Sequence, residues 1–266
     1  GLNGYDLMAR AGRYKPNKGK FPHILGGDFG GVLTALGPDA QTDLEIGTRV
    51  TAWWVVTCGT CEQCLAGHQN RCSRDYRYLG AHLHGAYAQY VKLPALGLIP
   101  LPDTLSYEEA AAFPNAFGTA WHMLMVRAKL QAGETVLVNS ASSGVSMAAI
   151  QIAKLAGAYV LTTSSADWKL EKAAALGADE IINYNECDFT DEVLKRTGKR
   201  GVDVVVEHVG GDFLEKSIRC LTRGGRLVTV GGTKSYDCQI PVNYVFHKEL
   251  SVIGSNSATK RDLELM

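Results

Sequence analysis

The amino-acid sequence predicts an α/β protein in which a doubly wound parallel sheet follows a domain of short, irregular β-strands. Over residues 121–266, short apolar runs rich in β-branched side chains alternate with helical patterns, which is typical of a parallel sheet covered by helices. Over residues 1–120, glycines and prolines separate short strand candidates, and no long helical pattern occurs before Tyr107. We therefore expect two domains, with the boundary near residue 120.

Each domain has its own set of expected strands. Those of the first domain are residues 30–36, 49–56, 86–92 and 98–101. Those of the second domain are residues 135–139, 159–163, 180–182, 202–206, 226–230 and 251–253. Helices are expected between the strands of the second domain, centred near Ile150, Lys172, Val193 and Leu214.

The second domain opens with a βαβ unit. An apolar strand over residues 135–139 is followed by a turn of small residues at 140–144 and by a helix from about Val145 to Ala156. That helix is apolar on nearly every side, so we expect it to lie against a sheet. A small-residue turn at a helix N-terminus exposes backbone N–H groups that can bind a pyrophosphate.

The glycine fingerprint of dinucleotide-binding turns is incomplete in this turn. Its three glycine positions hold Ala141, Ser143 and Ser146, and Gly144 lies between the last two. Each substitute is small, so close approach of a phosphate is still possible, although a plain packing turn is the alternative. The pyrophosphate contacts are expected from Ser142, Ser143, Gly144 and Val145.

Composition narrows the class of protein. The chain has 266 residues with 27 basic and 27 acidic side chains, and its zero net charge indicates neither a nucleic-acid nor an anionic-membrane partner. No apolar run approaches membrane-spanning length and no signal peptide precedes the first domain, so a cytoplasmic protein is expected. The chain opens at Gly1, without a methionine, inside what reads as a domain, so we expect a fragment of a longer protein.

Four cysteines form the sharpest metal-binding motif. Cys58, Cys61, Cys64 and Cys72 have the spacing C-x2-C-x2-C-x7-C, with which four thiolates can surround one zinc ion tetrahedrally. Disulfide pairing is the alternative, but nothing in the sequence indicates an oxidising compartment. Because protein would fill all four positions, the expected zinc is structural and leaves no position for water or substrate.

This domain order and cysteine motif resemble the medium-chain dehydrogenase/reductase superfamily. Its members combine a GroES-like β domain that carries a four-cysteine lobe with a Rossmann domain. The resemblance continues through the motifs at residues 1–6, 24–28, 118–121 and 209–211, and it covers effectively the whole chain. Full-length members have further N-terminal strands and a C-terminal segment that returns to the β domain, so truncation at both ends is expected.

The resemblance also argues against a catalytic zinc. Zinc-dependent members of the superfamily hold that metal with two cysteines and a histidine, and the matching positions here are Asn3, Gly27 and Asn115. Glycine offers no ligand, and neutral amides are poor zinc ligands beside thiolate or imidazole. A rearranged zinc site that uses His82 and His84 is the alternative. We expect no catalytic zinc.

Without that Lewis acid, the sequence is similar to the zinc-free branch of the superfamily, the quinone oxidoreductases and the enoyl or enone reductases. In that branch a hydride from the nicotinamide adds to a quinone or to the β-carbon of an activated C=C bond, and hydrogen-bond donors stabilise the enolate. The resemblance implies that Asn3 positions the nicotinamide or the carbonyl, that Thr119 forms the nicotinamide wall, and that Asn115 is a polar contact nearby. Turn or cap roles are the alternative for the two asparagines.

The end of the second strand of the sheet favours NADPH over NADH. An enzyme that binds NAD places an acidic residue there to hold the ribose hydroxyls, whereas this chain has Ser164 and Ser165, with Lys169 one turn into the next helix. Hydroxyls and a lysine attract a 2′-phosphate that a carboxylate would repel. The NADPH pattern of quinone reductases also matches at Tyr184, and Gly231 is expected to let backbone pass close to the nicotinamide. An ordinary solvated helix residue is the alternative for Lys169.

Three functions are therefore open. The leading one is an NADPH-dependent reductase of quinones or α,β-unsaturated carbonyls, with enoyl thioesters among its substrates. The second is a zinc-dependent alcohol dehydrogenase, and the third is a non-catalytic member that binds a nucleotide or a partner. In the superfamily, the strand that matches residues 250–255 pairs with its twin across a dimer interface, so a homodimer is implied by the resemblance. No nucleic-acid or membrane partner is expected.

Overall fold

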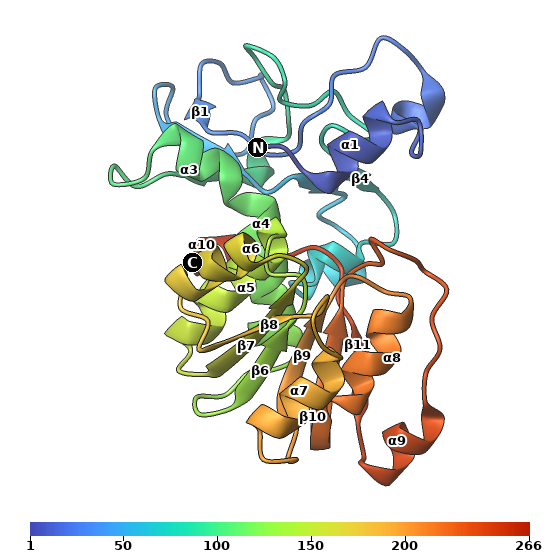
Figure 1. Cartoon of the computed structure of the whole chain (residues 1–266). Coiled ribbons are helices and arrows are strands. Elements are labelled where there is room, and N and C mark those ends of the chain that lie inside the picture. The colour runs from blue at the N-terminus through green and yellow to red at the C-terminus, as the bar shows by residue number, and fades with distance from the viewer. The chain divides into compact units, whose positions relative to one another are not determined.

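The computed structural model describes all 266 residues, and the chain folds into two compact units. The first unit comprises residues 1–118 together with 257–266, and the second comprises residues 119–256 (Figure 1). These units are defined by contacts within this chain. The expectation of two domains that meet near residue 120 therefore stays a prediction. None of the helices combines the length and the apolar character needed to cross a membrane.

A six-stranded parallel sheet forms the second unit. Its strand order is β11-β10-β9-β6-β7-β8. The chain adds β7 and β8 on one side of β6, and then β9, β10 and β11 on the other side. The strands are β6 (Thr135–Val138), β7 (Tyr159–Ser164), β8 (Glu180–Asn183), β9 (Val202–Glu207), β10 (Leu221–Thr229) and β11 (Ser251–Gly254). The doubly wound parallel sheet expected from the sequence is confirmed.

The central strand β6 shows why the apolar runs form this sheet. Val136, Leu137 and Val138 are all fully buried, as expected for a parallel strand that is covered on both faces. Val136 pairs with Val160 of β7 on one side and with Val204 of β9 on the other. The β-branched runs therefore lie side by side in the middle of the sheet.

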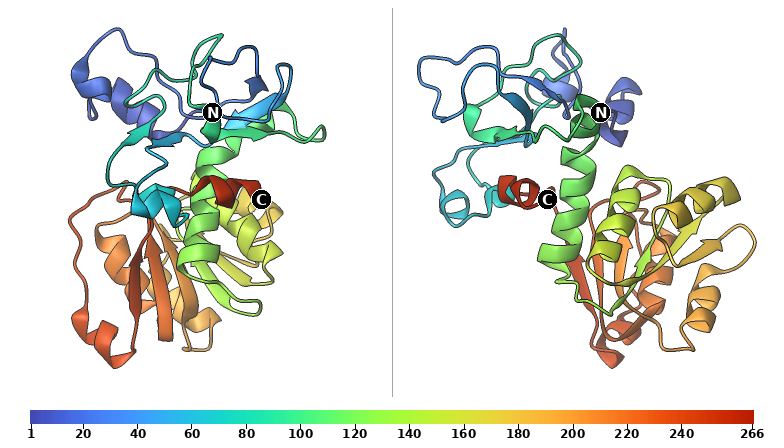
Figure 2. Two further views of the ribbon diagram at one scale, coloured as in Figure 1. Left: turned by 180° about the vertical axis from the view of Figure 1, so that it is seen from behind. Right: turned by 90° about the vertical axis from the view of Figure 1, so that its left-hand side faces the viewer.

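Helices cover both faces of this sheet, which Figure 2 shows from two further directions. They are α5 (Gly144–Leu155), α6 (Asp167–Ala175), α7 (Phe189–Arg196), α8 (Asp212–Arg219) and the more peripheral α9 (Val242–His247). Right-handed crossovers put α5 and α6, which connect β6, β7 and β8, on one face, and α8, which connects β9 to β10, on the other. One core cluster joins α7 and α8 to the sheet through Leu137, Leu161, Ile182, Phe189, Val193, Leu214 and Ile218.

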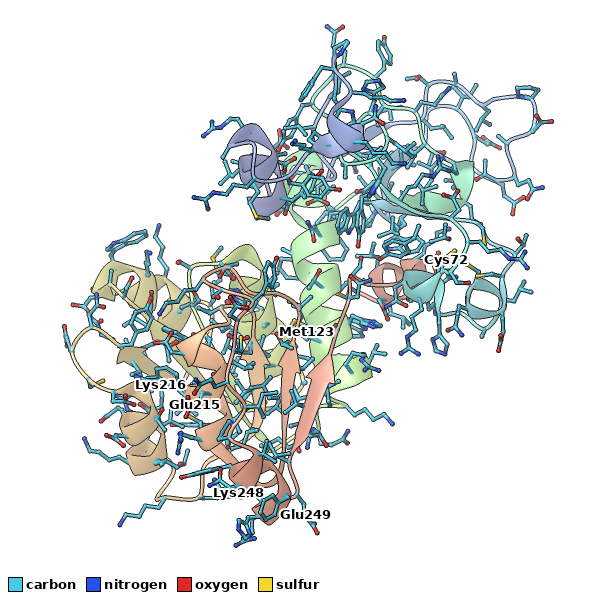
Figure 3. The ribbon with its side chains drawn as sticks, turned by 90° about the vertical axis from the view of Figure 1, so that its right-hand side faces the viewer. Cys72, Met123, Glu215, Lys216, Lys248 and Glu249 are labelled. Carbon is cyan, nitrogen blue, oxygen red and sulfur yellow. The ribbon has the colours of Figure 1, made fainter.

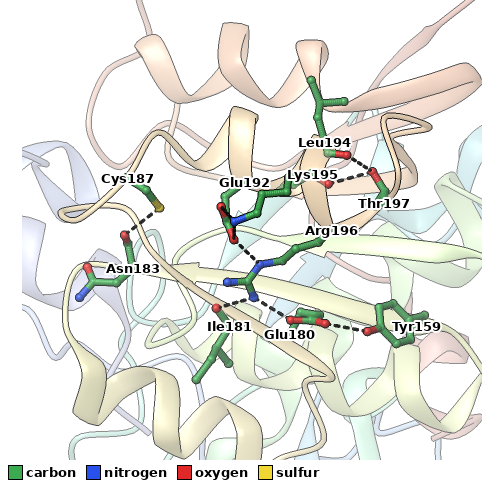
Figure 4. Close-up of polar contacts among 11 residues, drawn as sticks. Tyr159, Glu180, Ile181, Asn183, Cys187, Glu192, Leu194, Lys195, Arg196 and Thr197 are labelled. Atoms are coloured by element: carbon green, nitrogen blue, oxygen red, sulfur yellow. Dashed lines mark hydrogen bonds and ion pairs between the residues drawn. The ribbon is translucent and has the colours of Figure 1, made fainter.

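A polar network fastens α7 to the sheet at the amino ends of two strands (Figure 4). Arg196 of α7 donates to a carboxylate oxygen of Glu180 at 2.7 Å and to the carbonyl of Ile181 at 2.9 Å. The hydroxyl of Tyr159 donates to the other oxygen of Glu180 at 3.0 Å. Tyr159 and Glu180 are the first residues of β7 and β8, so this network lies opposite the carboxyl ends, where doubly wound sheets bind ligands.

Short antiparallel strands and several helices form the first unit. β1 (Gly31–Val32), β2 (Arg49–Ala52) and β5 (Leu98–Pro100) form a sheet in the order β1-β2-β5, and β3 (Val55–Thr57) pairs with β4 (Tyr76–Tyr78). The helices are α1 (Gly4–Arg10), α2 (Glu62–Leu65), α3 (Tyr107–Ala112) and α10 (Lys260–Glu264), with 3₁₀ turns η1 (Pro16–Gly19), η2 (Gln69–Arg71) and η3 (Ala95–Gly97). The boundary between the units falls within α4 (Pro114–Trp121), which continues as the π-helical η4 (His122–Arg127). The carbonyl of Ala258, just before α10, accepts a hydrogen bond from the indole of Trp53 at 2.8 Å.

Two strand expectations for the first unit are wrong. Residues 86–92 form no strand, because the backbone N–H groups of residues 85–87 bond to carbonyls of the loop at 24–26 and Tyr90 is 77% exposed. Their apolar alternation therefore has no partner strand and no buried face. Residues 49–56 divide into β2 and β3, which pair with different strands, instead of forming one continuous strand. Helix α1 was not expected, since its few residues carry no long apolar period.

Candidate functional site

The four cysteines of the metal motif meet in one cluster. The Sγ atoms of Cys58, Cys61, Cys64 and Cys72 all lie within 4.8 Å of one another, and four of the sulfur pairs are 3.5 to 3.9 Å apart. A zinc ion bound tetrahedrally by thiolates at about 2.3 Å requires sulfur–sulfur distances of about 3.8 Å. A disulfide requires about 2.0 Å, and all four cysteines are free. The donor set therefore fits one zinc ion, and Figure 3 marks its fourth ligand, Cys72.

Short local elements bring these sulfurs together. Cys61 is the N-cap of α2, Cys64 lies within that helix, and Cys72 follows η2. The backbone N–H groups of Cys64 and Ser73 donate to the sulfur of Cys61 and lower its pKa, which favours the thiolate that binds metal. Because protein occupies every position of the tetrahedron, a zinc held here would be structural.

The strand order of the second unit reverses between β6 and β9. In doubly wound sheets, ligands bind at such a switch point, outside the carboxyl ends of the strands. The turn after β6 leads into α5, and the turn after β9 carries the buried imidazole of His208. The Nε2 atom of His208 lies 2.8 Å from the hydroxyl oxygen of Ser146 and 3.0 Å from that of Ser143. One side chain therefore joins the two turns that border the switch point.

The N-terminus of α5 presents backbone N–H groups at this edge of the sheet. Ser143 caps the helix, since its hydroxyl accepts the N–H of Ser146 at 3.0 Å. The N–H groups of Gly144 and Val145 precede the first intrahelical bond, which the N–H of Met147 donates. Two aligned donors at the positive end of a helix dipole suit an anion. The turn contains all four of the expected pyrophosphate contacts, Ser142, Ser143, Gly144 and Val145.

The residues expected to select the cofactor lie at the carboxyl end of β7. Ser164, the last residue of the strand, is buried, and the half-buried Ser165 follows it. Lys169 lies in the first turn of α6, where its ammonium is 5.5 Å from the ring centre of the exposed Trp168. Two hydroxyls and one ammonium are therefore close along the chain at the edge of the sheet that binds ligands.

Two neighbouring side chains bear on the choice of cofactor. The ring of Tyr184 packs edge-on against Phe213 at 5.2 Å, so part of its surface belongs to the core. Asp167 opens α6 and accepts a hydrogen bond from the amide of Asn183 at 2.9 Å. Asp167 was missed from the sequence, although a carboxylate so close to the end of β7 is able to accept ribose hydroxyls.

The glycines that follow β9 and β10 lie in different surroundings. Gly210 has a φ of +73°, and a Cβ atom there would collide with the carbonyl oxygen of Ser235, so the fold itself requires glycine. Gly231 is exposed, and a Cβ atom there would meet only the carbonyl oxygen of His208, at 3.9 Å. The packing of this unit therefore leaves space beside the backbone of Gly231.

In the first unit, Asn3 and Asn115 both reach Asp28. The Nδ2 atom of Asn3 donates to Oδ2 of Asp28 at 2.7 Å, and the backbone N–H of Asn115 also donates to this carboxyl. Asp28 is 4% exposed, and its Oδ1 atom has no hydrogen-bond partner. Burial raises the pKa of Asp28 to about 6, against the opposing effect of the Asn3 hydrogen bond. Asp6 accepts the backbone N–H groups of Asn3 and Gly26, at 2.9 and 3.1 Å.

Asn3 also has a structural role, because it is the N-cap residue of α1. The cap role left open by the sequence therefore accompanies its contact with Asp28. Thr119, the expected nicotinamide wall, is a buried residue of α4 that belongs to the second unit.

The two loop histidines, His82 and His84, have different hydrogen-bond partners. The Nδ1 atom of His82 accepts the N–H of Tyr78 at 3.0 Å, and the Nδ1 atom of His84 accepts the N–H of Ile24 at 3.3 Å. The ring of His84 stacks on that of His23, with centroids 5.2 Å apart. The fold brings at least three possible metal-binding side chains together in the four-cysteine cluster. Neither His82 nor His84 belongs to that cluster.

Comparison with known proteins gives the family. The alcohol dehydrogenase GroES-like domain matches residues 1–103, and the zinc-binding dehydrogenase domain matches residues 144–266. An acryloyl-coenzyme A reductase of Metallosphaera sedula is 33% identical over 264 residues, which are 97% of this chain and 75% of that protein. The chain belongs to the medium-chain dehydrogenase/reductase superfamily.

Further proteins are similar to this chain over different shares of their own length. The quinone oxidoreductase of Homo sapiens is 29% identical, over 99% of this chain and 71% of that protein. The crystal structure of an NAD-dependent alcohol dehydrogenase has a TM-score of 0.92 and 45% identity, over 98% of this chain and 76% of that one. A phenolphthiocerol/phthiocerol polyketide synthase of Mycobacterium tuberculosis is 36% identical over 236 residues, which are 89% of this chain but 9% of that protein. The relatives of this family are named dehydrogenases and reductases, so the expectation that the chain is an oxidoreductase is confirmed.

Two residues at the switch point of this dehydrogenase fold were missed from the sequence, His208 and Glu207. Glu207, the last residue of β9, is fully buried and accepts the N–H groups of Val209 and Gly210 at 2.7 and 2.9 Å. Burial raises the pKa of Glu207, while these hydrogen bonds lower it. The available signal was the polar pair Glu207-His208 at the end of a mostly apolar strand, one residue before two glycines.

Proposed function

We propose that this chain transfers a hydride from NADPH to a quinone or to the C=C bond of an α,β-unsaturated carbonyl, such as an enone or an enoyl thioester, without a catalytic zinc. The observation that carries the proposal is the contact between Asn3 and Asp28. At the positions that the family resemblance matches to the ligands of a catalytic zinc, this chain has two amides and a glycine, Asn3, Asn115 and Gly27. An amide nitrogen that gives one N–H to a carboxylate keeps a second N–H, which suits an enolate oxygen, and an amide is a poor zinc ligand.

The role of Asn3 follows from the charge that develops during the reaction. As a hydride adds to the β-carbon, the electron pair of the C=C bond moves toward the carbonyl oxygen, which becomes an enolate oxygen. A donor placed at that oxygen acts most strongly in the transition state, because the charge is greatest there. We assign this donor to Asn3, with Asn115 as a second polar contact nearby. A proton from solvent then completes the saturated product.

NADPH supplies the hydride when it is bound, and residues of the second unit hold and orient it. We assign its pyrophosphate to the turn at the N-terminus of α5, and its 2′-phosphate to Ser165 and Lys169, with Ser164 and Tyr184 beside them. The open space at Gly231 and the side chain of Thr119 are assigned to the nicotinamide. NADH is the less favoured cofactor. The observation in its favour is the carboxylate of Asp167, which is able to accept the ribose hydroxyls of NADH.

Two relatives support this substrate class. One is named acryloyl-coenzyme A reductase and the other quinone oxidoreductase, and both match nearly the whole of this chain. The test measures oxidation of NADPH with three acceptors in parallel: an enoyl thioester, a cyclic enone and a benzoquinone. We expect turnover with at least one acceptor, on protein that holds about one zinc per chain. Oxidation of alcohols by NAD⁺ together with failure on all three acceptors would overturn the proposal.

A second function is favoured by one comparison. The NAD-dependent alcohol dehydrogenase structure is 45% identical to this chain, more than either reductase. Alcohol oxidation through a metal would require a second zinc on ligands other than the four cysteines, so elemental analysis near two zinc per chain would support it. A third candidate, a non-catalytic nucleotide-binding protein, predicts NADPH binding without turnover of any acceptor.

We further propose a homodimer and a cytoplasmic location. β11 is an edge strand of the sheet, and its Val252 is 39% exposed. The unpaired backbone groups of an edge strand can pair with the same strand of a second copy across a two-fold axis. Light scattering should give the mass of a dimer, and a monomer at every protein concentration would contradict this. Cell fractionation tests the location.

A further inference from the structure

Asp28 is a carboxyl that is buried beside Asn3. Its Oδ2 atom accepts the amide of Asn3 at 2.7 Å, while its Oδ1 atom is buried without a hydrogen-bond partner. Burying a carboxylate with one oxygen unsatisfied costs free energy, so a group of this kind is kept where it has a use. The titratable and charged groups that face this carboxyl are Asp6, the hydroxyl of Tyr87 and the amino group of Gly1.

The carboxylate decides which end of the Asn3 amide points toward it. An amide side chain has a donor end and an acceptor end of nearly the same shape, and an ionised carboxylate can only accept. Asp28 therefore selects the nitrogen of Asn3, leaving the second N–H of that nitrogen free to donate elsewhere. The backbone N–H of Asn3 is bound by Asp6 at 2.9 Å, which fixes the residue from its other side.

We propose that Asp28 is the positioning residue of Asn3, holding the amide nitrogen so that its second N–H is presented to the carbonyl oxygen of the substrate. This inference rests on the proposed function, in which Asn3 is the donor to that oxygen. Asp28 itself acts through Asn3 and does not take part in the chemistry.

Protonation of Asp28 would release the amide. A protonated carboxyl is itself a donor, so it no longer distinguishes the nitrogen of Asn3 from its oxygen. Burial raises the pKa of Asp28 to about 6, and the neighbouring charge of Asp6 acts in the same direction. The orientation of the Asn3 amide should therefore change with a midpoint near pH 6.

The first experiment needs no substrate. The side-chain amide signals of Asn3 are followed in ¹H–¹⁵N spectra of the whole protein between pH 4.5 and 8, and are assigned by their loss in Asn3→Ser. We expect them to shift with a midpoint of about 6 in the wild type and to be independent of pH in Asp28→Asn, which keeps the shape and an acceptor oxygen. Signals that do not titrate, or that titrate equally in Asp28→Asn, would overturn the inference.

The second experiment separates positioning from a structural role. Asp28→Leu removes the acceptor, and should lower kcat on the order of tenfold to a hundredfold with little change in the KM for NADPH. Asp28→Asn offers both a donor and an acceptor, as the protonated carboxyl does, so its kcat should stay at every pH near the reduced value that the wild type reaches below pH 6. Asp43→Asn, at an exposed loop position, is the matched control and should behave as the wild type.

The two experiments also distinguish this inference from the proposed function. A wild type that reduces none of the acceptors, but whose Asn3 amide titrates with Asp28, would remove the function and leave the Asn3–Asp28 coupling intact. A wild type that reduces an acceptor, but whose kcat is unchanged in Asp28→Leu, would remove the positioning role alone.

Discussion

The Nε2 atom of His208 lies 2.8 Å from the hydroxyl oxygen of Ser146. The hydroxyl of Ser146 donates its own proton to the backbone carbonyl of Asn139 at 2.7 Å, and on this ground we assign the donor role in the contact between His208 and Ser146 to the imidazole Nε2. Burial lowers the pKa of His208, which keeps the ring neutral at pH 7. A neutral imidazole thus ties the turn after β9 to the helix that we assign to the pyrophosphate.

Replacement of His208 by leucine should weaken binding of NADPH and NADH by the same factor. The turn before α5 would lose a buried hydrogen bond of about 1 kcal/mol, which corresponds to roughly a fivefold increase in Kd. Both cofactors should be affected equally, because they share the pyrophosphate. Calorimetric titration measures the effect, and the exposed His247→Leu is the control. A loss confined to one cofactor would contradict the assignment.

Replacement of Cys61 by serine should remove zinc from the protein. A hard hydroxyl is a poor substitute for a thiolate, and the remaining three sulfurs lose tetrahedral closure. Elemental analysis should fall from about one zinc per chain toward zero, with a lower Tm, since structural zinc contributes on the order of 10 kcal/mol to folding. Cys187→Ser, at an exposed cysteine outside the cluster, should keep both zinc and Tm. Unchanged zinc content in Cys61→Ser would rule out the cysteine site.

Replacement of Lys169 by alanine should affect NADPH alone. A charge-assisted contact between an ammonium and a phosphate is worth about 1.5 kcal/mol, so Kd for NADPH should rise about tenfold while Kd for NADH stays unchanged. Lys195→Ala is the control, because that lysine lies on α7 and pairs with Glu192. An equal loss for both cofactors would show that Lys169 does not contact the 2′-phosphate.

Replacement of Gly231 by valine tests the space beside its backbone. The fold tolerates a side chain at this position, since a Cβ atom would meet nothing closer than 3.9 Å, so Tm should be nearly unchanged. A nicotinamide close to the backbone would be displaced, and kcat should fall on the order of tenfold or more. Gly37→Val, where a Cβ atom also meets nothing, is the control. Normal kcat in Gly231→Val would place the nicotinamide elsewhere.

Replacement of Asp28 by asparagine should change how stability depends on pH. Folding raises the pKa of this carboxyl from 3.8 to about 6, so the folded state binds more protons than the unfolded state between those values. The wild type therefore loses stability as pH rises from about 4 to about 6, by an amount on the order of 3 kcal/mol. Urea unfolding at several pH values should show that Asp28→Asn lacks this loss and gains relative to the wild type above pH 6. Parallel curves for the two proteins would contradict the pKa shift.

The sequence by itself determined the parts of this protein whose cause is local. The strands β6 to β11 and the helices α5 to α8 were expected at nearly their observed positions, because side-chain periodicity reports which face of an element is buried. The four cysteines lie within residues 58–72, so their spacing alone was enough to predict that their sulfurs meet. The strand expected at 86–92 failed because alternation does not specify a partner strand.

Only the tertiary structure decided which polar groups meet. His208 and Ser146 are 62 residues apart, and Asn3 and Asp28 are 25 residues apart, so no helical or strand period relates either pair. The first pair meets because the strand order places β9 beside β6. A buried imidazole or carboxylate without a partner would cost free energy, so each of these groups is paired by its surroundings in space. A one-dimensional pattern records which residues are polar, but it contains no information about those surroundings.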